Sequence, residues 1–166
     1  MATHVHVLDA MNAMRPNVAA HGQAVEAMNA MRPSACANFR NDVEDSIQDE
    51  ICDSGFYAGI ALEAPNETLR EIVWTISRTE YWHAQLQEAL LANNPPVSPP
   101  PTCPTATGNF AADVETAIHG ELGAVTRYAQ LAMCAPTVTI RLLFMALLND
   151  ESLHVGVWTA MLNPVA

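Results

Sequence analysis

The chain has 166 residues, half of them apolar and 15% charged, and its formal net charge is −11. This length and apolar content suit one domain with a sizeable core, and they exclude a long disordered chain. The acidic balance, with no cluster of Lys or Arg to offset it, argues against nucleic-acid binding. No apolar run is long enough to cross a membrane.

Residues 1–40 are predicted to form an N-terminal extension. Within it the heptapeptide Ala-Met-Asn-Ala-Met-Arg-Pro occurs at 10–16 and again at 27–33, a shift of 17 residues. Each copy predicts a short amphipathic helical turn that proline ends. Four methionines would share one face: Met11, Met14, Met28 and Met31. Such faces are usually packing surfaces, so the repeat could dock a partner or a second copy of the chain, and a homodimer is kept open.

A larger repeat fills the rest of the chain. Residues 42–91 align without a gap onto residues 113–162, and 16 of the 50 pairs are identical. In each copy apolar residues recur at steps of three and four, which is typical of amphipathic helices. A proline, Pro65 or Pro136, ends the first helix of each copy and suits the opening of the next. The sequence therefore predicts an all-α fold that uses one helical hairpin twice.

A proline-rich linker at 93–108 joins the predicted hairpins, 42–92 and 109–163. As polyproline II its 16 residues would reach about 50 Å, more than the roughly 37 Å of a 25-residue helix. The linker can therefore run the whole length of the bundle at 41–166, which is the single long crossover of ferritin-like four-helix bundles. A plain linker between two separate hairpins is the alternative, but a lone hairpin cannot bury both of its apolar stripes.

The four cysteines are irregularly spaced, and none forms a Cys-x-x-Cys pair, which argues against a zinc ribbon or a rubredoxin-type site. They are Cys36, Cys52, Cys103 and Cys134. We interpret them as free thiols in a reducing compartment. Because the first ten residues lack the basic and apolar regions of a signal peptide, we expect a cytoplasmic location.

Two Glu-x-x-His motifs occur at equivalent places in the larger repeat, at 80–83 and 151–154. Residues three apart share one face of a helix, so each motif could bind a metal ion. A single motif of this kind is weak evidence, because short motifs often occur by chance. Two copies at equivalent positions of a repeat are much stronger evidence.

The hairpin geometry extends this argument to four carboxylates. Glu50 and Glu80 each lie 15 residues from Pro65, so an antiparallel hairpin returns them to the same height, and Glu121 and Glu151 bracket Pro136 likewise. Each lies in an apolar stripe and would point inward. Four buried carboxylates need a counter-charge, which two divalent cations supply. The predicted ligands are Glu50, Glu80, His83, Glu121, Glu151 and His154. Mixed oxygen and imidazole ligands favour iron or manganese, with zinc as a further candidate.

One Glu on each of two helices, with Glu-x-x-His on each of the other two, resembles the ferritin-like di-iron carboxylate superfamily. Rubrerythrins, bacterioferritins and manganese catalases are similar in this respect. The resemblance covers residues 42–162, about three-quarters of the chain. It implies that Glu80 and Glu151 bridge two metal ions and that Glu50 and Glu121 are terminal or bridging ligands. His83 and His154 would each cap one metal.

The same resemblance implies roles for neighbouring residues. Tyr57 and Tyr128 follow Glu50 and Glu121 by seven residues, where family members often have a tyrosine bonded to a ligand carboxylate. Ordinary core tyrosines are the alternative interpretation. Asp150 would orient His83. The matching position in the first half is Thr79, so the two metals need not be equivalent.

We therefore predict a di-metal oxidoreductase, with iron as the first candidate metal, that reacts with O2 or peroxide. We expect neither haem nor a nucleotide, since Tyr81 stands where a bacterioferritin-like sequence would offer a haem-binding methionine. Three alternatives stay open. The chain could bind or sequester metal without turnover, it could be an interaction module with a structural di-metal site, or it could be a metal-free bundle.

Overall fold

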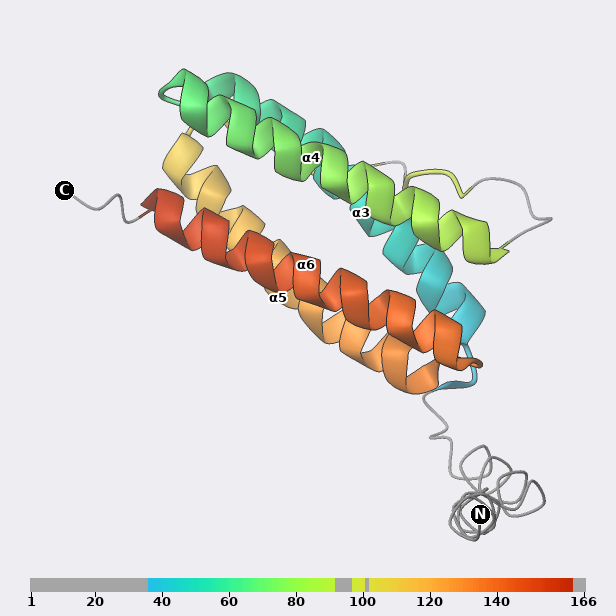
Figure 1. The fold of residues 1–166 in the computed structure, drawn as a ribbon. Coiled ribbons are helices and arrows are strands. Elements are labelled where there is room, and N and C mark those ends of the chain that lie inside the picture. The colour runs from blue at the N-terminus through green and yellow to red at the C-terminus, as the bar shows by residue number, and fades with distance from the viewer. Residues whose placement is uncertain (1–35, 92–96, 101, 163–166) are drawn as a thin grey trace, which may run out of the picture. The chain divides into compact units, whose positions relative to one another are not determined.

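The computed structural model describes residues 36–91, 97–100 and 102–162. Four long helices make two antiparallel hairpins that pack side by side (Figure 1). They are α3 Phe39–Glu63, α4 Glu67–Glu88, α5 Phe110–Cys134 and α6 Val138–Leu162, and a short 3-10 turn, η2 Ala89–Leu91, follows α4. No strand occurs in these described ranges. The predicted all-α four-helix bundle is confirmed, whereas the methionine-rich repeat lies outside the described residues.

Three of the four helices begin on a side-chain cap. Asn66, Asn109 and Thr137 each accept a hydrogen bond from the backbone N–H three residues later, at 2.9, 3.3 and 3.2 Å. These bonds satisfy N–H groups that have no partner within the helix. Pro65 and Pro136 lie in the short turns between paired helices, where a missing N–H costs nothing. The turns therefore lie where the sequence predicted them.

The core consists of two apolar clusters. The first is Phe56, Tyr57, Ile60, Ala61, Val73, Ile76, Val114, Ala117 and Trp158, and the second is Val43, Ile47, Ala84, Tyr128, Leu131, Ala132, Phe144 and Leu147. Full burial of one such large side chain contributes roughly 1.5–3 kcal/mol. Both clusters draw residues from both hairpins, and they therefore join the hairpins into one core.

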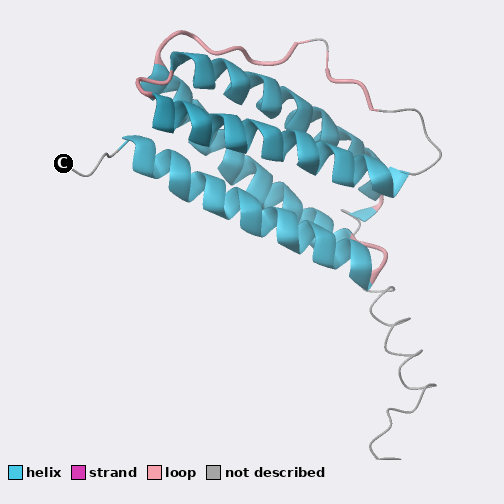
Figure 2. Cartoon of the chain, turned by 45° about the horizontal axis from the view of Figure 1, so that its top comes forward, coloured by secondary structure: helices cyan, strands magenta, loops and turns pink. Residues whose placement is uncertain are grey.

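The crossover segment, residues 97–100 and 102–109, connects the hairpins along the side of the bundle (Figure 2). At its start the backbone N–H of Val97 donates to Glu88 Oε1 at 3.2 Å. Near its end Thr107 donates two hydrogen bonds to Asp113, at 2.8 and 2.9 Å. The Cβ of Ala106 lies only 2.9 Å from where a Cβ on Gly59 would stand, so glycine at position 59 lets the segment approach α3 closely.

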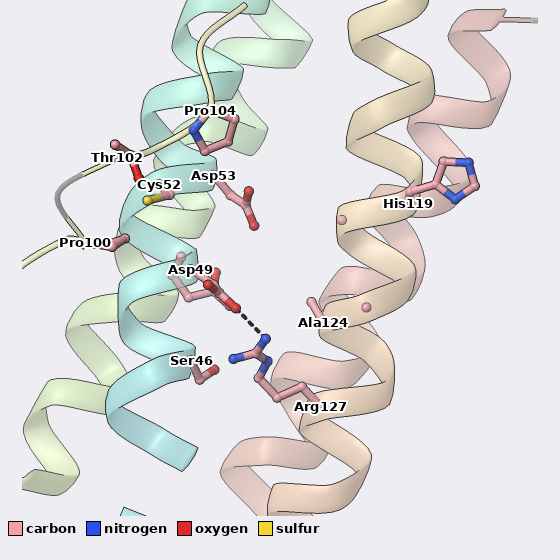
Figure 3. A pocket seen from close by; sticks show the side chains of 13 residues that line it. Ser46, Asp49, Cys52, Asp53, Pro100, Thr102, Pro104, His119, Ala124 and Arg127 are labelled. Atoms are coloured by element: carbon pink, nitrogen blue, oxygen red, sulfur yellow. Dashed lines mark ion pairs between the residues drawn. The ribbon is translucent and has the colours of Figure 1, made fainter. Parts of the chain in front are cut away.

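A disulfide between Cys52 of α3 and Cys103 joins the middle of the crossover segment to the bundle. Pro100, Thr102 and Pro104 lie beside it (Figure 3). All four cysteines of the chain are disulfide-bonded. The prediction of free thiols is wrong, because the crossover brings together cysteines that are distant in sequence.

These disulfides bear on the expected cytoplasmic location, since structural disulfides persist in oxidising compartments and are rare in a reducing cytosol. That location therefore loses the support that free thiols would have given it. Among the helices described, none combines the length and apolar character needed to cross a membrane.

Candidate metal centre

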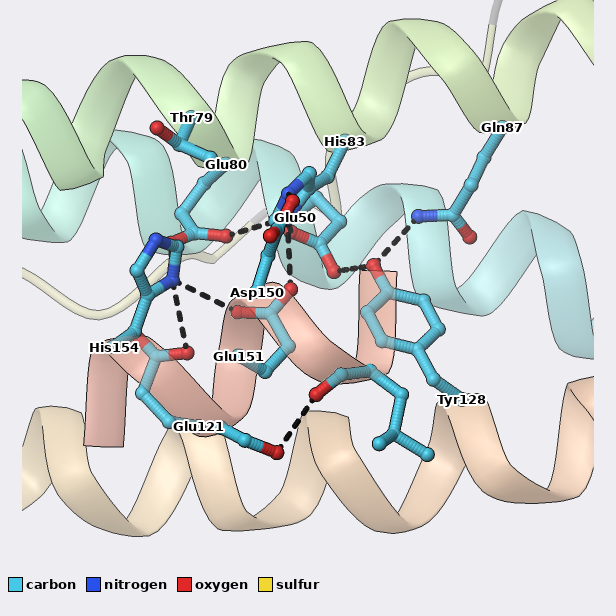
Figure 4. Close-up of polar contacts among 12 residues, drawn as sticks. Glu50, Thr79, Glu80, His83, Gln87, Glu121, Tyr128, Asp150, Glu151 and His154 are labelled. Atoms are coloured by element: carbon cyan, nitrogen blue, oxygen red, sulfur yellow. Dashed lines mark hydrogen bonds and ion pairs between the residues drawn. The ribbon is translucent and has the colours of Figure 1, made fainter. Parts of the chain in front are cut away.

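All six predicted ligands lie together on the inner faces of the four helices (Figure 4). Each helix contributes: α3 carries Glu50, α4 carries Glu80 and His83, α5 carries Glu121, and α6 carries Glu151 and His154. Every one of them is buried, with at most 8% of its surface exposed. Buried carboxylates at this density are rare in proteins unless they are paired or bind a cation.

The ligand atoms fall into two groups that share two residues. Glu50, Glu80, His83 and Glu151 form one group, and Glu80, Glu121, Glu151 and His154 form the other. Within each group one ligand atom per residue lies within 4.8 Å of all the others. Glu80 and Glu151 therefore belong to both groups, as two bridging carboxylates would.

The shared carboxylates divide their oxygens between the two imidazoles. Glu80 places Oε2 3.1 Å from Nδ1 of His83 and Oε1 2.9 Å from Nδ1 of His154. Glu151 places Oε1 2.8 Å from Nδ1 of His83 and Oε2 3.0 Å from Nδ1 of His154. The unshared carboxylates are more distant, since Glu50 lies 3.6 Å from His83 and Glu121 lies 3.6 Å from His154.

Burial and the proximity of the carboxylates to one another shift the pKa values within the cluster. Burial, followed by neighbouring carboxylates, raises the pKa of Glu121 to about 8, although a hydrogen bond to His154 opposes this, and burial also raises that of Glu50 well above its usual value. Burial would lower the pKa of His83 and His154, but hydrogen bonds to the carboxylates outweigh it and raise both to about 12. Burial acts to raise the pKa of Glu151, but its two histidine partners lower it to about 2.

The donor set fits a pair of metal ions. Oε1 of Glu80 and Oε1 of Glu151 are buried and accept no hydrogen bond from the described residues, although an imidazole nitrogen is within 3 Å of each. Buried acceptors of this kind need a partner. Oxygen and imidazole nitrogen are the ligands that iron, manganese and zinc accept. Two divalent cations would balance four ionised carboxylates without the protons that the metal-free cluster holds.

Each predicted tyrosine contacts a carboxylate of the opposite hairpin. Tyr128 of α5 donates its hydroxyl hydrogen to Oε1 of Glu50. Burial and the nearby charge of Glu121, with a hydrogen bond to that carboxylate, raise the pKa of Tyr57 well above its usual value. Both tyrosines are buried, so they are neutral donors to the two unshared carboxylates.

Two hydrogen bonds next to these carboxylates were missed by the sequence analysis. Gln87 donates to the hydroxyl oxygen of Tyr128 at 2.8 Å, and Trp158 donates its indole N–H to Oε1 of Glu121 at 2.9 Å. Gln87 and Trp158 occupy equivalent positions of the repeat. Each lies four residues after the histidine of a Glu-x-x-His motif, on the same face of its helix. That spacing was the signal from which the sequence could have predicted them. The two halves therefore support equivalent carboxylates by different bonds.

Asp150 lies where the resemblance placed it, with Oδ2 3.6 Å from Nε2 of His83. That nitrogen has no hydrogen-bond partner among the described residues. At the matching position of the first hairpin, Thr79 donates instead to the carbonyl of Thr75 in its own helix, at 3.0 Å. His83 therefore has a carboxylate beside its outer nitrogen, and the matching residue beside His154 supplies no charge.

No protein-family model matches the chain, and no curated protein matches it. A solved structure of a hypothetical protein from Pyrococcus furiosus is similar, with a TM-score of 0.67 over 84% of this chain and 93% of that chain. The two sequences are 18% identical, so this likeness concerns the fold alone.

Proposed function

We propose that this chain is a di-metal carboxylate protein, with iron as the first candidate, and that it reduces O2 or peroxide as a ferritin-like oxidoreductase. One observation carries the proposal: Glu80 and Glu151 each direct one oxygen toward His83 and the other toward His154. A carboxylate that serves two imidazoles in this way is placed to bridge two cations. The resemblance in motif and spacing supports the same assignment.

The ligand roles follow from which groups are shared. Glu80 and Glu151 would bridge, Glu50 and His83 would complete one metal position, and Glu121 and His154 would complete the other. A bound metal pair of this type supplies redox chemistry, since each ion changes its charge by one and a two-electron oxidant needs both. Zinc has no such redox chemistry, so iron or manganese suits the proposed reaction.

The surrounding residues would keep the centre dry and manage protons. The two apolar clusters draw on both hairpins and surround the ligands with buried side chains, and exclusion of water strengthens every charge interaction inside the site. Tyr128 and Tyr57 hold hydroxyl protons against Glu50 and Glu121. Those bonds would orient the unshared carboxylates toward the metals, as outer hydrogen bonds do in other metal sites.

Metal content and single-turnover reactivity test the proposal together. Protein purified without chelators would contain about two iron or manganese ions per chain if the shared arrangement is occupied. After anaerobic reduction, stopped-flow absorbance would follow reoxidation of the metals by hydrogen peroxide and, separately, by O2. Rapid reoxidation with a stoichiometry of one peroxide per metal pair supports the enzyme.

Two other outcomes would contradict it in different ways. Tightly held zinc, with no iron uptake under anaerobic conditions, would replace the oxidoreductase with a structural di-metal site. Bound iron that peroxide and O2 leave reduced would favour metal binding without turnover. A variant at an exposed carboxylate of α5, Glu115→Gln, is the control for nonspecific loss of metal.

A further inference from the structure

A pocket of about 370 Å³ lies between α3 and α5, beneath the crossover segment (Figure 3). Of the six ligand residues, Glu50 alone lines it. Another pocket, of about 310 Å³, is lined by residues of α4 only and contains no ligand residue. The pocket between α3 and α5 therefore joins the outside of the bundle to a ligand of the proposed metal centre.

The two sides of this pocket differ. The α3 side carries Asp49, Cys52 and Asp53, whereas the equivalent positions on α5 are Gly120, Gly123 and Ala124. The space exists because α5 presents small residues where α3 presents larger ones. A Cβ placed on Gly123 would meet no atom within 4 Å, so a larger side chain there would extend into open space and leave the helix in place.

The crossover segment forms the outer wall. Pro100, Thr102 and Pro104 line the pocket on either side of Cys103, which the disulfide ties to Cys52. The segment is also held on both sides of this wall, by the Val97 bond at its start and by the Thr107 bonds near its end. Loss of the disulfide would therefore release the wall while the ends of the segment stay attached.

Charge and size limit what could pass. Asp49 is paired with Arg127 across the pocket (Figure 3), while Asp53 has no hydrogen bond or ion pair to another described residue. Because Arg127 neutralises Asp49, the excess negative charge of the pocket rests on Asp53, whose pKa burial and neighbouring carboxylates raise to about 7, and this charge disfavours anions. At about 30 Å³ for each water in the liquid, the volume exceeds that of hydrogen peroxide and suits a small organic hydroperoxide.

We propose that the pocket between α3 and α5 is the entrance to the metal centre for small uncharged peroxides, and that the disulfide-held crossover segment sets the size of hydroperoxide it admits. This rests on the proposed function. The reaction is ROOH + 2 H⁺ + 2 e⁻ → ROH + H2O, in which the O–O bond breaks. The reduced metal pair supplies both electrons, one from each ion, and solvent supplies the protons.

The decisive variant is Gly123→Leu, which fills the pocket without altering a ligand. Its matched control is Gly55→Leu, at an exposed glycine of α3 that does not line the pocket and whose Cβ would also meet nothing within 4 Å. We expect reoxidation of the reduced, metal-loaded protein by hydrogen peroxide to slow about tenfold or more in Gly123→Leu only. Final metal content should be unchanged in both variants.

A readout independent of turnover is the rate at which metal-free protein takes up Co²⁺, followed by its visible absorption. Entry past Glu50 predicts slower uptake in Gly123→Leu and an unchanged rate in Gly55→Leu. Removal of the disulfide by the double variant Cys52→Ser/Cys103→Ser should raise the rate with cumene hydroperoxide relative to hydrogen peroxide, because the outer wall is released.

Equal rates in Gly123→Leu and the unaltered protein would overturn the assignment of this pocket as the entrance. If the double variant leaves the ratio of the cumene hydroperoxide rate to the hydrogen peroxide rate unchanged, the role of the crossover segment is overturned. If metal binds but no peroxide reacts, the proposed function fails while Co²⁺ uptake still decides the entrance. If the unaltered protein takes up no metal, both proposals fall.

Discussion

Tyr128 of the second hairpin donates its hydroxyl hydrogen to Glu50 of the first. The same hydroxyl oxygen accepts a hydrogen bond from Gln87 at 2.8 Å, so its position is defined from two sides. All three residues are buried. A carboxylate of one hairpin is thus oriented by a residue of the other, and the two hairpins cannot shift past each other without disturbing the candidate metal centre.

Tyr128→Phe should therefore weaken metal binding and leave the fold intact. The change removes the donor to Glu50 and leaves Gln87 without its acceptor, which costs about 1–3 kcal/mol for buried groups. Loss of an outer hydrogen bond to a ligand typically lowers metal affinity about 10–100-fold. Competition with a coloured chelator measures the affinity. Tyr81→Phe, at a tyrosine that is 52% exposed, is the control, and equal affinities in the two variants would contradict the role of Tyr128.

Shared and unshared carboxylates should differ in their effect on metal content. Glu151→Gln alters a residue of both ligand groups, whereas Glu50→Gln alters a residue of only one. We expect Glu151→Gln to lose both ions and Glu50→Gln to retain about one of two. Elemental analysis after gel filtration decides this. Complete loss in both variants would mean that the two positions fill only together.

The asymmetry between Asp150 and Thr79 gives a third prediction. Asp150→Asn removes the charge 3.6 Å from Nε2 of His83, and we expect the affinity for one metal to fall about tenfold, as for other outer-shell changes. Thr79→Asp would place a carboxylate at the equivalent position near His154 and should strengthen the other metal site. Stepwise titration with Co²⁺ separates the two affinities. Equal affinities in the unaltered protein would contradict the asymmetry.

The metal-free protein should lose stability as the pH rises, while the stabilisation by added metal should increase. In the metal-free form the pKa of Glu121 is raised from 4.5 to about 8, and those of His83 and His154 from 6.5 to about 12. The folded state therefore binds protons more tightly than the unfolded state. The stability from these groups is complete at low pH and is lost as the pH rises through these values. Glu151, with its pKa lowered from 4.5 to about 2, contributes stability above pH 4.5 that is lost as the pH falls from there towards 2.

The melting temperature in EDTA should consequently fall between pH 5.5 and pH 8.5. The gain in melting temperature on adding metal should increase over the same range, because metal ions compete with protons for the ligands. Differential scanning calorimetry at three pH values measures both. A metal-free protein whose melting temperature rises with pH over this range would contradict the protonated cluster.

The Cys52–Cys103 disulfide should contribute strongly to stability, since it closes a loop of 51 residues. The chain-entropy estimate for that length is about 4 kcal/mol. Cys52→Ser/Cys103→Ser should lower the free energy of unfolding by up to this amount in urea denaturation at fixed metal load. A change below about 1 kcal/mol in the double variant would argue against a closed loop in the native protein.

The ligand cluster was predictable because a repeat converts a weak motif into a strong one. Glu80 and His83 alone would be a chance pattern, but their copies at 151 and 154 and the equal spacing about each proline locate them in the bundle. The disulfide was not predictable, since Cys103 meets Cys52 only through the path of the crossover segment. The pocket was missed for a related reason, as it depends on which face of α5 carries Gly120 and Gly123.

The division of the ligands between the hairpins has a mechanical consequence. Neither hairpin holds a complete ligand group, because each group takes Glu80 from one hairpin and Glu151 from the other. A bound metal pair would therefore hold the two hairpins together reversibly. It would add RT ln(1 + [metal]/Kd) to the free energy needed to separate them. Between the hairpins the main packing joins α3 to α5, while α4 and α6 touch only slightly. Removal of the metal by a chelator should thus separate α4 from α6 before it separates α3 from α5.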